Sequence, residues 1–541
     1  MDENKIALII YKTSDAPTNS IKQMLSSLTI PEGFRPTASI VSGPNRWRAY
    51  NQAMKASDAK YKIYLDEQVE MLNNNILVDL VEMFRSDRSV GMIGCCGSIE
   101  LSTHAIPYQS AKRCGKIVLG PKKINAVWQQ SEAPYQEVEV LDGFMLATQY
   151  DIDWRDDLFE ENSYGDFAQS IEFRRRGYKC VVARQEQPWI WYRNDSMPFY
   201  DGERKKFLAE YSKELFPLVQ ILIPTFNRPQ FFTVALESAM NQTYRNIEII
   251  ISDDSTNELT YAAVQPYLEK DDRIKYFRNA GFTASDNGKF LEKKMWERTE
   301  AEYFSWLFDD DMFYPTKIEK MIEAYRNNPD VSLVSSRRHN IDENGKVLGE
   351  MEPLHNKTEK LSNERVGKFL LMYTANRIGE PSTVLIKKKF LVDEDKKHWR
   401  KRPDMIDSPN ALGDYSQWLY LLEQGNIFWI NEVLSARRMH AGQDSQQIGT
   451  WVQIYVNFAE EVNEFWRRKK FITTNEELRH TIIIWLTKAA GALQRAFLEN
   501  YNGRETQMME RVIPAMVLAL SNGGNIKFPS WPKPDRKEKS H

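Results

Sequence analysis

The first two hundred residues alternate short apolar runs with stretches whose apolar positions recur at helical spacing. Each apolar run is short enough for a strand, and polar or turn-forming residues separate the runs. We predict strands at residues 5–11, 38–41, 61–65 and 90–93, with helices at 21–28, 51–56 and 76–84. Strands that alternate with helices indicate βα units and a mostly parallel sheet.

The same pattern starts again at Leu218. We predict strands at residues 219–224, 247–251, 274–277, 303–308 and 331–335, with helices at 233–241, 260–268, 287–300 and 316–327. In both halves a helix leads into an apolar strand, an acidic turn, a helix and another strand, as in NQAMKASDAKYKIYLDEQVEML and NGKFLEKKMWERTEAEYFSWLFDDDMFY. We interpret this as the internal duplication of a domain rather than as a short-period repeat.

The character of the chain changes after Gly449, where three helices are predicted at residues 451–470, 476–500 and 505–521. Their regular apolar positions predict packing on the preceding domain, with dimerisation or acceptor docking as alternatives. The predicted fold class is α/β, with tandem, Rossmann-like and mostly parallel domains before a helical region. The predicted parts are a first domain (1–200), a linker helix (201–216), a second domain (217–449), a helical region (450–525) and a disordered tail (526–541).

Composition and charge fit a globular protein of several domains. The 541 residues exceed what one hydrophobic core usually supports, and 42% apolar with 27% charged residues is ordinary for a soluble protein. The formal net charge of -3 gives no general attraction to nucleic acid, so no nucleic-acid partner is expected.

The amino terminus and the cysteines indicate a cytoplasmic protein. The first residues, MDENKIALIIYKTSD, lack the basic start and the long apolar stretch of a signal peptide. No apolar run reaches transmembrane length, which leaves only peripheral contact with a membrane open. Four cysteines without a C-x-x-C spacing favour reduced thiols over a zinc site or disulfides.

Three consecutive aspartates, Asp309, Asp310 and Asp311, follow the apolar run at residues 303–308. Their mutual repulsion makes it costly to keep all three ionised unless a cation or hydrogen bonds compensate. Carboxylate oxygens are the ligands that hard divalent cations prefer. We therefore expect a divalent metal ion that holds a phosphate-bearing substrate.

Two more polar loops follow strands of the same predicted sheet. Residues 224–229 (PTFNRP) follow the first strand of the second half, and residues 252–255 (SDDS) follow the next one. Ligands bind beyond the carboxyl ends of the strands in open parallel sheets, so all three loops are expected to line one crevice. Taken alone, residues 252–255 would be an ordinary turn with a helix cap.

The pieces IPTFNRP, NQTYRNIEIIISDDS, DNGKF and FDDDMFYPTKIEKM resemble, in order and spacing, the inverting family 2 glycosyltransferases with the GT-A fold. The resemblance covers residues 217–445. It implies a nucleotide-diphosphate sugar as donor, by default a UDP-sugar, and a divalent cation, Mn²⁺ or Mg²⁺. It also implies a hexosyltransferase reaction by direct displacement, with inversion at the anomeric carbon.

The resemblance implies roles for individual residues as well. Those that match donor-binding positions of the family are Pro224, Thr225, Phe226, Asn227, Asp253, Asp254, Asn287, Asp309, Asp311, Arg437 and Arg438. Asp310 corresponds to the metal ligand of the family. His440, in the segment SARRMHAGQDS, corresponds to a further metal ligand, with a purely structural histidine as the alternative.

The reaction also needs a base that takes the proton of the acceptor. In the family an acidic residue at the start of a helix on the acceptor side does this, and Asp414 in LGDYSQWLYLLEQG matches it. A plain helix N-cap is the alternative interpretation of Asp414. Glu380, in a loop that resembles the acceptor side of the family, is a weaker candidate.

The first half resembles another branch of the same superfamily over residues 5–200, through AYNQAMKAS, KIYLDEQVEML, VGMIGCCGS, VLDGFMLAT and YGDFAQSIEFRRRGYKCVVA. By position, Asp66 corresponds to the metal motif and Asp166 to the base. The acidic turn reads Asp-Glu-Gln rather than D-x-D, and the histidine that the branch has after its last tryptophan is missing. The first half is therefore either a second active transferase or a degenerate copy used for acceptor binding or assembly.

The whole sequence predicts a bacterial-type glycosyltransferase that builds a surface polysaccharide or a glycan on a protein. Two linked active domains would add successive sugars to one glycan or glycoprotein acceptor. One active domain beside a degenerate one is the first alternative, a nucleotidyltransferase or phosphotransferase the second, and a carbohydrate-binding scaffold the third. A homo-oligomer formed through the carboxyl-terminal helices is compatible with the pattern.

Overall fold

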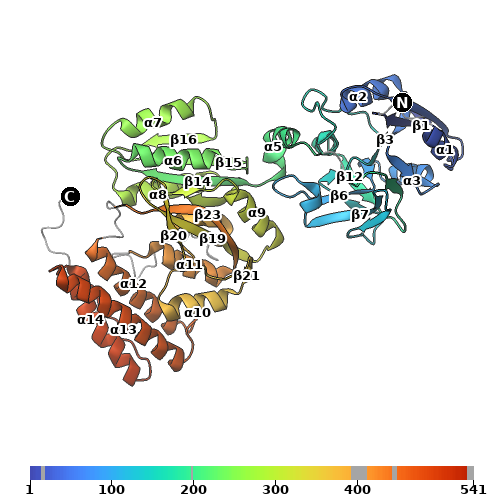
Figure 1. Cartoon of the computed structure of the whole chain (residues 1–541). Coiled ribbons are helices and arrows are strands. Elements are labelled where there is room, and N and C mark those ends of the chain that lie inside the picture. Colours follow the sequence, from blue (N-terminus) through green and yellow to red (C-terminus); the bar gives the residue numbers. More distant parts are fainter. Residues whose placement is uncertain (14–18, 196–198, 392–410, 441–446, 533–541) are drawn as a thin grey trace. The chain divides into compact units, whose positions relative to one another are not determined.

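The computed structural model describes residues 1–13, 19–195, 199–391, 411–440 and 447–532 (Figure 1). The chain divides into two compact units, Met1–Phe216 and Pro217–His541. The predicted linker helix is α5 (Asp201–Leu215), which lies in unit 1. Among the described residues, none of the helices is both long enough and apolar enough to cross a bilayer.

The main sheet of unit 1 has the strand order β2-β1-β3-β11-β5-β12-β9. Strands β2, β1 and β3 run parallel, β11 runs antiparallel to both β3 and β5, and β12 is parallel to β5. The strands are β1 (Asp2–Tyr11), β2 (Arg35–Val41), β3 (Ala59–Asp66), β5 (Val90–Gly94), β9 (Tyr135–Glu137), β11 (Met145–Thr148) and β12 (Lys179–Ala183).

A second, smaller sheet completes unit 1, with the order β10-β6-β7-β13-β4 and β8 beside β7. Its strands are β4 (Val69–Met71), β6 (Cys96–Glu100), β7 (Lys112–Leu119), β8 (Ile124–Val127), β10 (Val140–Leu141) and β13 (Ile190–Tyr192). The other helices of the unit are α1 (Asn19–Ser26), α2 (Arg46–Ala56), α3 (Ile76–Ser86) and α4 (Gly165–Arg175).

Unit 2 is built on one sheet with the order β16-β15-β14-β17-β22-β19-β23-β18, to which β20 and β21 add at β19 and β23. The first strands are β14 (Leu218–Thr225), β15 (Ile247–Asp253), β16 (Ile274–Arg278), β17 (Ala301–Trp306) and β18 (Met312–Phe313). The later strands are β19 (Val331–Ile341), β20 (Val347–Glu350), β21 (Glu359–Leu361), β22 (Val384–Lys387) and β23 (Asn426–Arg438).

The helices of unit 2 fall into two groups. Within the described part of the unit, six accompany the sheet: α6 (Pro229–Met240), α7 (Leu259–Leu268), α8 (Ala284–Glu297), α9 (Lys317–Asn327), α10 (Asn363–Tyr373) and α11 (Gly413–Gln424). The remaining three stand side by side at the end of the chain (Figure 1), and they are α12 (Ile448–Arg467), α13 (Asn475–Leu498) and α14 (Arg504–Ser521).

The hydrogen bonding of the two sheets repeats the duplication seen in the sequence. The order β2-β1-β3-β11-β5-β12 in unit 1 matches β15-β14-β17-β22-β19-β23 in unit 2, strand by strand. The directions match too, because β11 and β22 are each antiparallel to both of their neighbours. The predicted α/β class and tandem organisation are confirmed, with one antiparallel strand inserted in the parallel core of each sheet.

The carboxyl-terminal helices belong to the core of unit 2. Trp485 of α13 is fully buried in the same apolar cluster as Trp418 of α11 and Trp429 of β23. The segment after α14 differs from the disordered tail expected from residue 526 onward. The Trp531 indole N–H donates to Glu460 of α12 at 2.8 Å, and Ile526 packs against the cluster. Residues 533–541 of the expected tail lie outside the described residues.

Candidate functional site

The three aspartates of unit 2 lie where β17 leaves the sheet. Four of the six side chains of β17 are buried, and the short strand β18 begins directly after Asp311. Asp309, Asp310 and Asp311 are themselves buried, with 6%, 9% and 3% of their surface exposed. The neighbouring strand β14 is parallel to β17 and ends at Thr225, so the predicted donor loop starts at the same edge.

Asp310 and His440 meet across this edge. The Asp310 carboxylate Oδ2 lies 2.9 Å from Nε2 of His440, although the two residues are far apart in the sequence. The antiparallel pairing of β18 with the end of β23 brings them together. Arg228, from the loop after β14, lies 3.5 Å from the same Asp310 oxygen.

Asp309 and Asp311 each form a hydrogen bond with the backbone of another segment of unit 2. Asp309 accepts a hydrogen bond from the Phe226 backbone N–H at 3.2 Å, and Asp311 accepts one from the Arg438 backbone N–H at 3.2 Å. Burial, reinforced by the neighbouring Asp310 carboxylate, raises the pKa of Asp309 to about 6. The same two causes raise the pKa of Asp311 above its ordinary value.

The donor set at this edge fits a divalent cation. Carboxylate oxygens suit Mn²⁺ or Mg²⁺, and His440 would add one imidazole nitrogen to them. Burial and the neighbouring Asp310 carboxylate raise the pKa of Asp309 and of Asp311, so a bound cation would favour their ionised forms. No group of three or more acidic, histidine or cysteine side chains in the described part of the chain could hold a metal. Asp310 and His440 would thus be only part of a coordination shell.

The predicted donor loop is tied to the loop after β15. Asn227 has a left-handed backbone (φ 54°), and its backbone N–H donates to the Ser255 hydroxyl at 2.7 Å. Its side-chain oxygen accepts from the Thr256 backbone N–H at 3.0 Å. Pro224 and Thr225 complete the end of β14, while the Phe226 ring is exposed. An exposed aromatic ring beside polar loops is suited to stack against a nucleobase.

Asp253 and Asp254 are buried in separate hydrogen-bond networks. Asp253 receives the Tyr276 hydroxyl at 2.6 Å and pairs with Arg278 at 3.1 Å, so much of its hydrogen-bonding capacity is used inside the protein. Asp254 accepts from the Asn287 side chain at 2.8 Å, and burial raises its pKa. Asn287 therefore fixes the orientation of Asp254 from α8.

Asp414 lies in the first turn of α11. One carboxylate oxygen accepts from the Asn376 side chain at 3.0 Å, and the other from the Tyr415 backbone N–H at 2.7 Å. The N-cap residue of α11 is Leu412, so Asp414 does not have the position of an N-cap. Burial, with a smaller contribution from Glu380, raises the pKa of Asp414 to about 7.

Glu380 and the two arginines of β23 have structural partners. Glu380 receives the Arg338 guanidinium through two hydrogen bonds, one of them 2.6 Å long, and Arg437 at 3.0 Å. Two cations stabilise its carboxylate, which makes Glu380 a poorer base than Asp414. The Arg438 side chain donates to the Asp310 backbone carbonyl at 3.0 Å and so helps to fix the backbone of the triplet.

In unit 1, Asp66 ends β3 and forms a buried ion pair with Arg46, the first residue of α2. The guanidinium donates to Oδ2, and the Gln68 backbone N–H donates to Oδ1 at 2.9 Å. Each oxygen of this predicted metal ligand is therefore already engaged, and the neighbouring charge is a protein cation. In this arrangement Asp66 fits a metal ion poorly.

Asp166 has the same place in α4 that Asp414 has in α11, because both helices begin with Gly-Asp. It accepts from the Gly143 backbone N–H at 2.8 Å. Burial, reinforced by the Asp142 carboxylate, raises the pKa of Asp166 to about 6. Asp142 is itself paired with the buried Arg113 of β7.

Both halves of the chain match known protein families. Residues 220–382 match the family described as glycosyl transferase family 2, and residues 7–211 match one described as a glycosyltransferase-like family. The chain carries two family 2-type glycosyltransferase domains in tandem. The first match includes both Asp66 and Asp166, and the second includes the aspartate triplet but ends before Asp414.

The curated relatives that the chain matches include glycosyltransferases, and the chain spans only part of their length. An uncharacterized glycosyltransferase of Rickettsia bellii is 27% identical over 51% of this chain and 37% of its own length. One of Rickettsia typhi is 31% identical over 42% of this chain and 65% of its own. A chondroitin synthase of Escherichia coli is 23% identical over 46% of this chain. The chain spans only part of these relatives, 33% in the last case.

Solved structures with some likeness to these glycosyltransferase domains include residues 1–349 of TarS from S. aureus in complex with UDP-GlcNAc. It has a TM-score of 0.36 and 16% identity, and the match covers 56% of this chain and 83% of that one. The mannosyltransferase PcManGT of Pyrobaculum calidifontis, in complex with GDP-Man and Mn²⁺, has a TM-score of 0.33 and 12% identity, with 60% and 94% covered.

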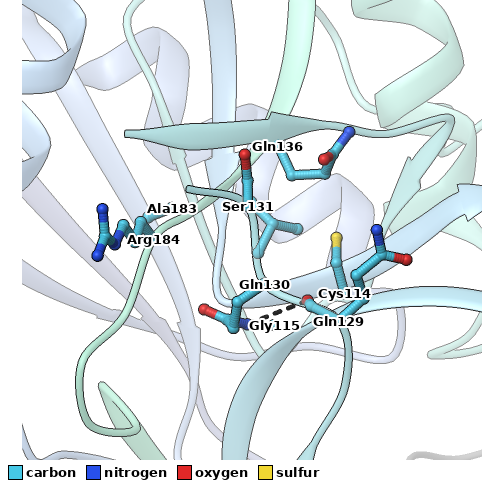
Figure 2. A pocket seen from close by; sticks show the side chains of 9 residues that line it. Cys114, Gly115, Gln129, Gln130, Ser131, Gln136, Ala183 and Arg184 are labelled. Carbon is cyan, nitrogen blue, oxygen red and sulfur yellow. Dashed lines mark hydrogen bonds between the residues drawn. The ribbon is translucent and has the colours of Figure 1, made fainter. Parts of the chain in front are cut away.

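A shallow, open depression elsewhere in the first glycosyltransferase domain encloses no space for a water molecule. Figure 2 shows its lining, which includes Cys114, Gln129, Gln136 and Arg184. None of the predicted site residues lines it.

The site contains residues that the sequence interpretation missed. Arg228 reaches the triplet, Arg338 holds Glu380, Asn376 orients Asp414, and Arg46 pairs with Asp66. Only Arg228 had a signal in the sequence, because it stands inside the loop IPTFNRP.

Proposed function

We propose that unit 2 transfers a hexose from a nucleoside diphosphate sugar, by default a UDP-sugar, to a hydroxyl group of a glycan or glycoprotein, with inversion. The family match supports glycosyl transfer from a nucleotide sugar. The observation that carries the proposal is that one segment, residues 376–382, contacts both the candidate base and the residue before the triplet. The Asn376 amide donates to Asp414 at 3.0 Å, and the Ser382 hydroxyl accepts from the Phe308 backbone N–H at 3.1 Å.

The roles of the residues follow from their places around this edge. Asp310 and His440 would hold Mn²⁺ or Mg²⁺, which when bound offsets the charge of the departing nucleoside diphosphate. The loop at Pro224–Asn227 and the network of Asp253, Asp254 and Asn287 would line the nucleoside. Asp309 and Arg228 would flank the diphosphate.

Asp414 would act as the general base. Its carboxylate accepts the proton of the acceptor hydroxyl while that oxygen forms a bond to the anomeric carbon and the bond to the diphosphate oxygen breaks. A pKa of about 7 suits a base that works near neutral pH. The Asn376 amide keeps the carboxylate oriented toward the acceptor side.

The hydrolysis of sugar donors and the transfer of their sugar are measured to test the proposal. A panel of UDP-, GDP- and dTDP-sugars is offered to the full chain with and without Mn²⁺, and nucleoside diphosphate release is measured. We expect Mn²⁺-dependent release with one donor, and a loss of about 100-fold or more in Asp310→Ala. Asp272→Ala, in an exposed loop of the same unit, is the matched control and should keep full activity. Full activity in Asp310→Ala would disprove the metal assignment, and no release from any donor would favour a carbohydrate-binding scaffold.

The biological setting is proposed on the same basis. The enzyme would work in the cytoplasm of a bacterium and extend a surface glycan or a protein-linked glycan. The domain limits predicted from the sequence are also part of this proposal. It includes the prediction that the carboxyl-terminal helical region serves acceptor docking or forms a homo-oligomer. If unit 1 is also active, two linked domains would add successive sugars to one acceptor.

A further inference from the structure

The two units place different charges at equivalent edges of their sheets. In unit 2 the strand β17 leads to three buried acids, and His440 faces Asp310. In unit 1 the equivalent strand β3 leads to Asp66, which faces the guanidinium of Arg46. Arg46 is only 4% exposed, so its charge is a fixed part of the site.

The surroundings of Arg46 are not saturated by the protein. Within the described residues its Nε atom has no hydrogen-bond partner, and one face of the guanidinium lies over the Tyr11 ring, 4.9 Å from the centroid. A buried N–H group without a partner costs free energy, and it remains poised to donate to a ligand. The nearby acids Asp142 and Asp166 each have one carboxylate oxygen that is likewise unpartnered in the described chain.

Glycines bring Arg46 and Asp166 close together. A Cβ atom on Gly165, the first residue of α4, would overlap the indole of Trp47, the second residue of α2. A Cβ atom on Gly143 would overlap the Asp166 carboxylate. The starts of α2 and α4 therefore touch, and they place the Arg46 cation and the Asp166 carboxylate in one cluster. Unit 1 therefore has an acid, Asp166, at the position of the proposed base. It has Arg46 in place of the proposed metal-binding groups of unit 2.

We propose that unit 1 binds a nucleoside diphosphate without a metal ion, with the Arg46 guanidinium in the role that a divalent cation has in unit 2. Arginine is suited to this role because its planar fork of N–H groups matches the oxygens of a phosphate. Asp66 and Tyr11 hold the fork in place, and Asp166 lies where the sugar of a nucleotide sugar would meet its acceptor. The ligand class, a nucleoside diphosphate sugar, rests on the proposed function.

Equilibrium dialysis of the full chain tests this site separately. The chain carries Asp310→Ala, which removes a metal ligand from unit 2, and it is dialysed against UDP, GDP, ADP, CDP and dTDP in EDTA. We expect one of these nucleotides to bind in EDTA, with a dissociation constant that added Mn²⁺ leaves within about twofold. No binding in EDTA, or binding that requires Mn²⁺, would overturn the proposal.

Two substitutions in that background identify the cation. Arg46→Gln should weaken binding by about tenfold or more, because the charge and the fork are lost. Arg48→Gln, on the same helix but with an exposed side chain, is the matched control and should bind as before. Unchanged binding in Arg46→Gln would refute the role of Arg46. If the melting curve shows that Arg46→Gln does not fold, Arg46→Lys replaces it, and the loss of the fork should still weaken binding measurably.

Asp66→Asn tests whether Asp66 binds a metal ion itself or only holds Arg46 in place. Without its negative partner, Arg46 offers more charge to the ligand, so binding in EDTA should be retained or become tighter. Loss of binding in a folded Asp66→Asn chain would contradict the proposal. The proposed function fails by a different readout, namely the absence of Mn²⁺-dependent donor release by unit 2 in the unsubstituted chain. The two failures can therefore be told apart.

Discussion

At the scale of single residues, the chemistry proposed for unit 2 uses carboxylates that burial has made weaker acids. Asp414 has a pKa of about 7, and Asp309 one of about 6, because both lie in the interior. The Asn376 amide donates to Asp414 at 3.0 Å, whereas Asp309 pairs with the Arg228 guanidinium at 3.4 Å. Such carboxylates can take up protons near neutral pH.

The pH profile of unit 2 should therefore show the titration of Asp414. A base acts in its ionised form, so kcat/KM should fall about tenfold for each pH unit below about 7 and level off above it. The measurement is the initial rate of nucleoside diphosphate release at constant Mn²⁺. A profile that stays flat down to about pH 5 would exclude Asp414 as the base.

The same burial should make Asp414 costly for stability. Its pKa is higher in the folded chain than the ordinary value, so the folded state loses stability as the pH rises from about 4 to about 7. Asp414→Asn removes this cost, and it should raise the melting temperature of unit 2 at pH 8 while abolishing transfer. Calorimetry at pH 8 checks this, and a melting temperature below that of the unsubstituted chain would contradict it.

At the scale of elements, close approaches between helices position the site of unit 1. α4 can begin beside Trp47 only because residue 165 has no side chain. The indole of Trp47 is itself stacked on Trp154, with ring centroids 5.4 Å apart, so it has little room to move. The contact between the starts of α2 and α4 thus depends on Gly165.

Gly165→Ala should destabilise unit 1 by about 1–3 kcal/mol, because the added methyl group overlaps an indole that cannot shift. Gly202→Ala is the matched control, since a Cβ atom there would meet nothing within 4 Å. Chemical denaturation followed by fluorescence compares the two. Equal stability of the two variants would show that the contact between α2 and α4 is loose.

At the scale of the molecule, the carboxyl-terminal helices complete unit 2. The Tyr415 ring of α11 packs on Phe458 of α12 at 4.8 Å, and the Trp485 indole N–H donates to the Tyr455 carbonyl at 2.7 Å. The helix that carries the candidate base is therefore covered by α12. Removal of α12–α14 would expose a large part of the apolar core to water.

A chain that ends at residue 447 should therefore be largely insoluble and without transferase activity. A chain that ends at residue 532 keeps every packed helix and should behave like the full protein. Soluble yield and donor release measure both. A soluble and active chain ending at residue 447 would show that the helices are an independent module.

Local sequence patterns predicted the helices and strands, but they did not predict which strands lie next to each other in the sheets. Alternation of apolar runs and helices predicted most strands, and the acidic turns marked two candidate sites. Periodicity does not distinguish a parallel from an antiparallel strand, so β11 and β22 were not recognised as antiparallel insertions. A lone arginine such as Arg46 has no sequence context that distinguishes it from a surface residue, and its burial was unexpected.

The family, the duplication and the aspartate triplet follow from the order of residues alone, because strand length, acidic turns and motif spacing are local properties of the chain. The charges that meet at each edge depend on the path of the whole chain. Pairing of β18 with β23 puts His440 on Asp310, and the start of α2 puts Arg46 on Asp66. Such contacts join residues that are remote in sequence, and only packing in three dimensions selects them. The same acidic turn thereby faces a histidine in one unit and an arginine in the other.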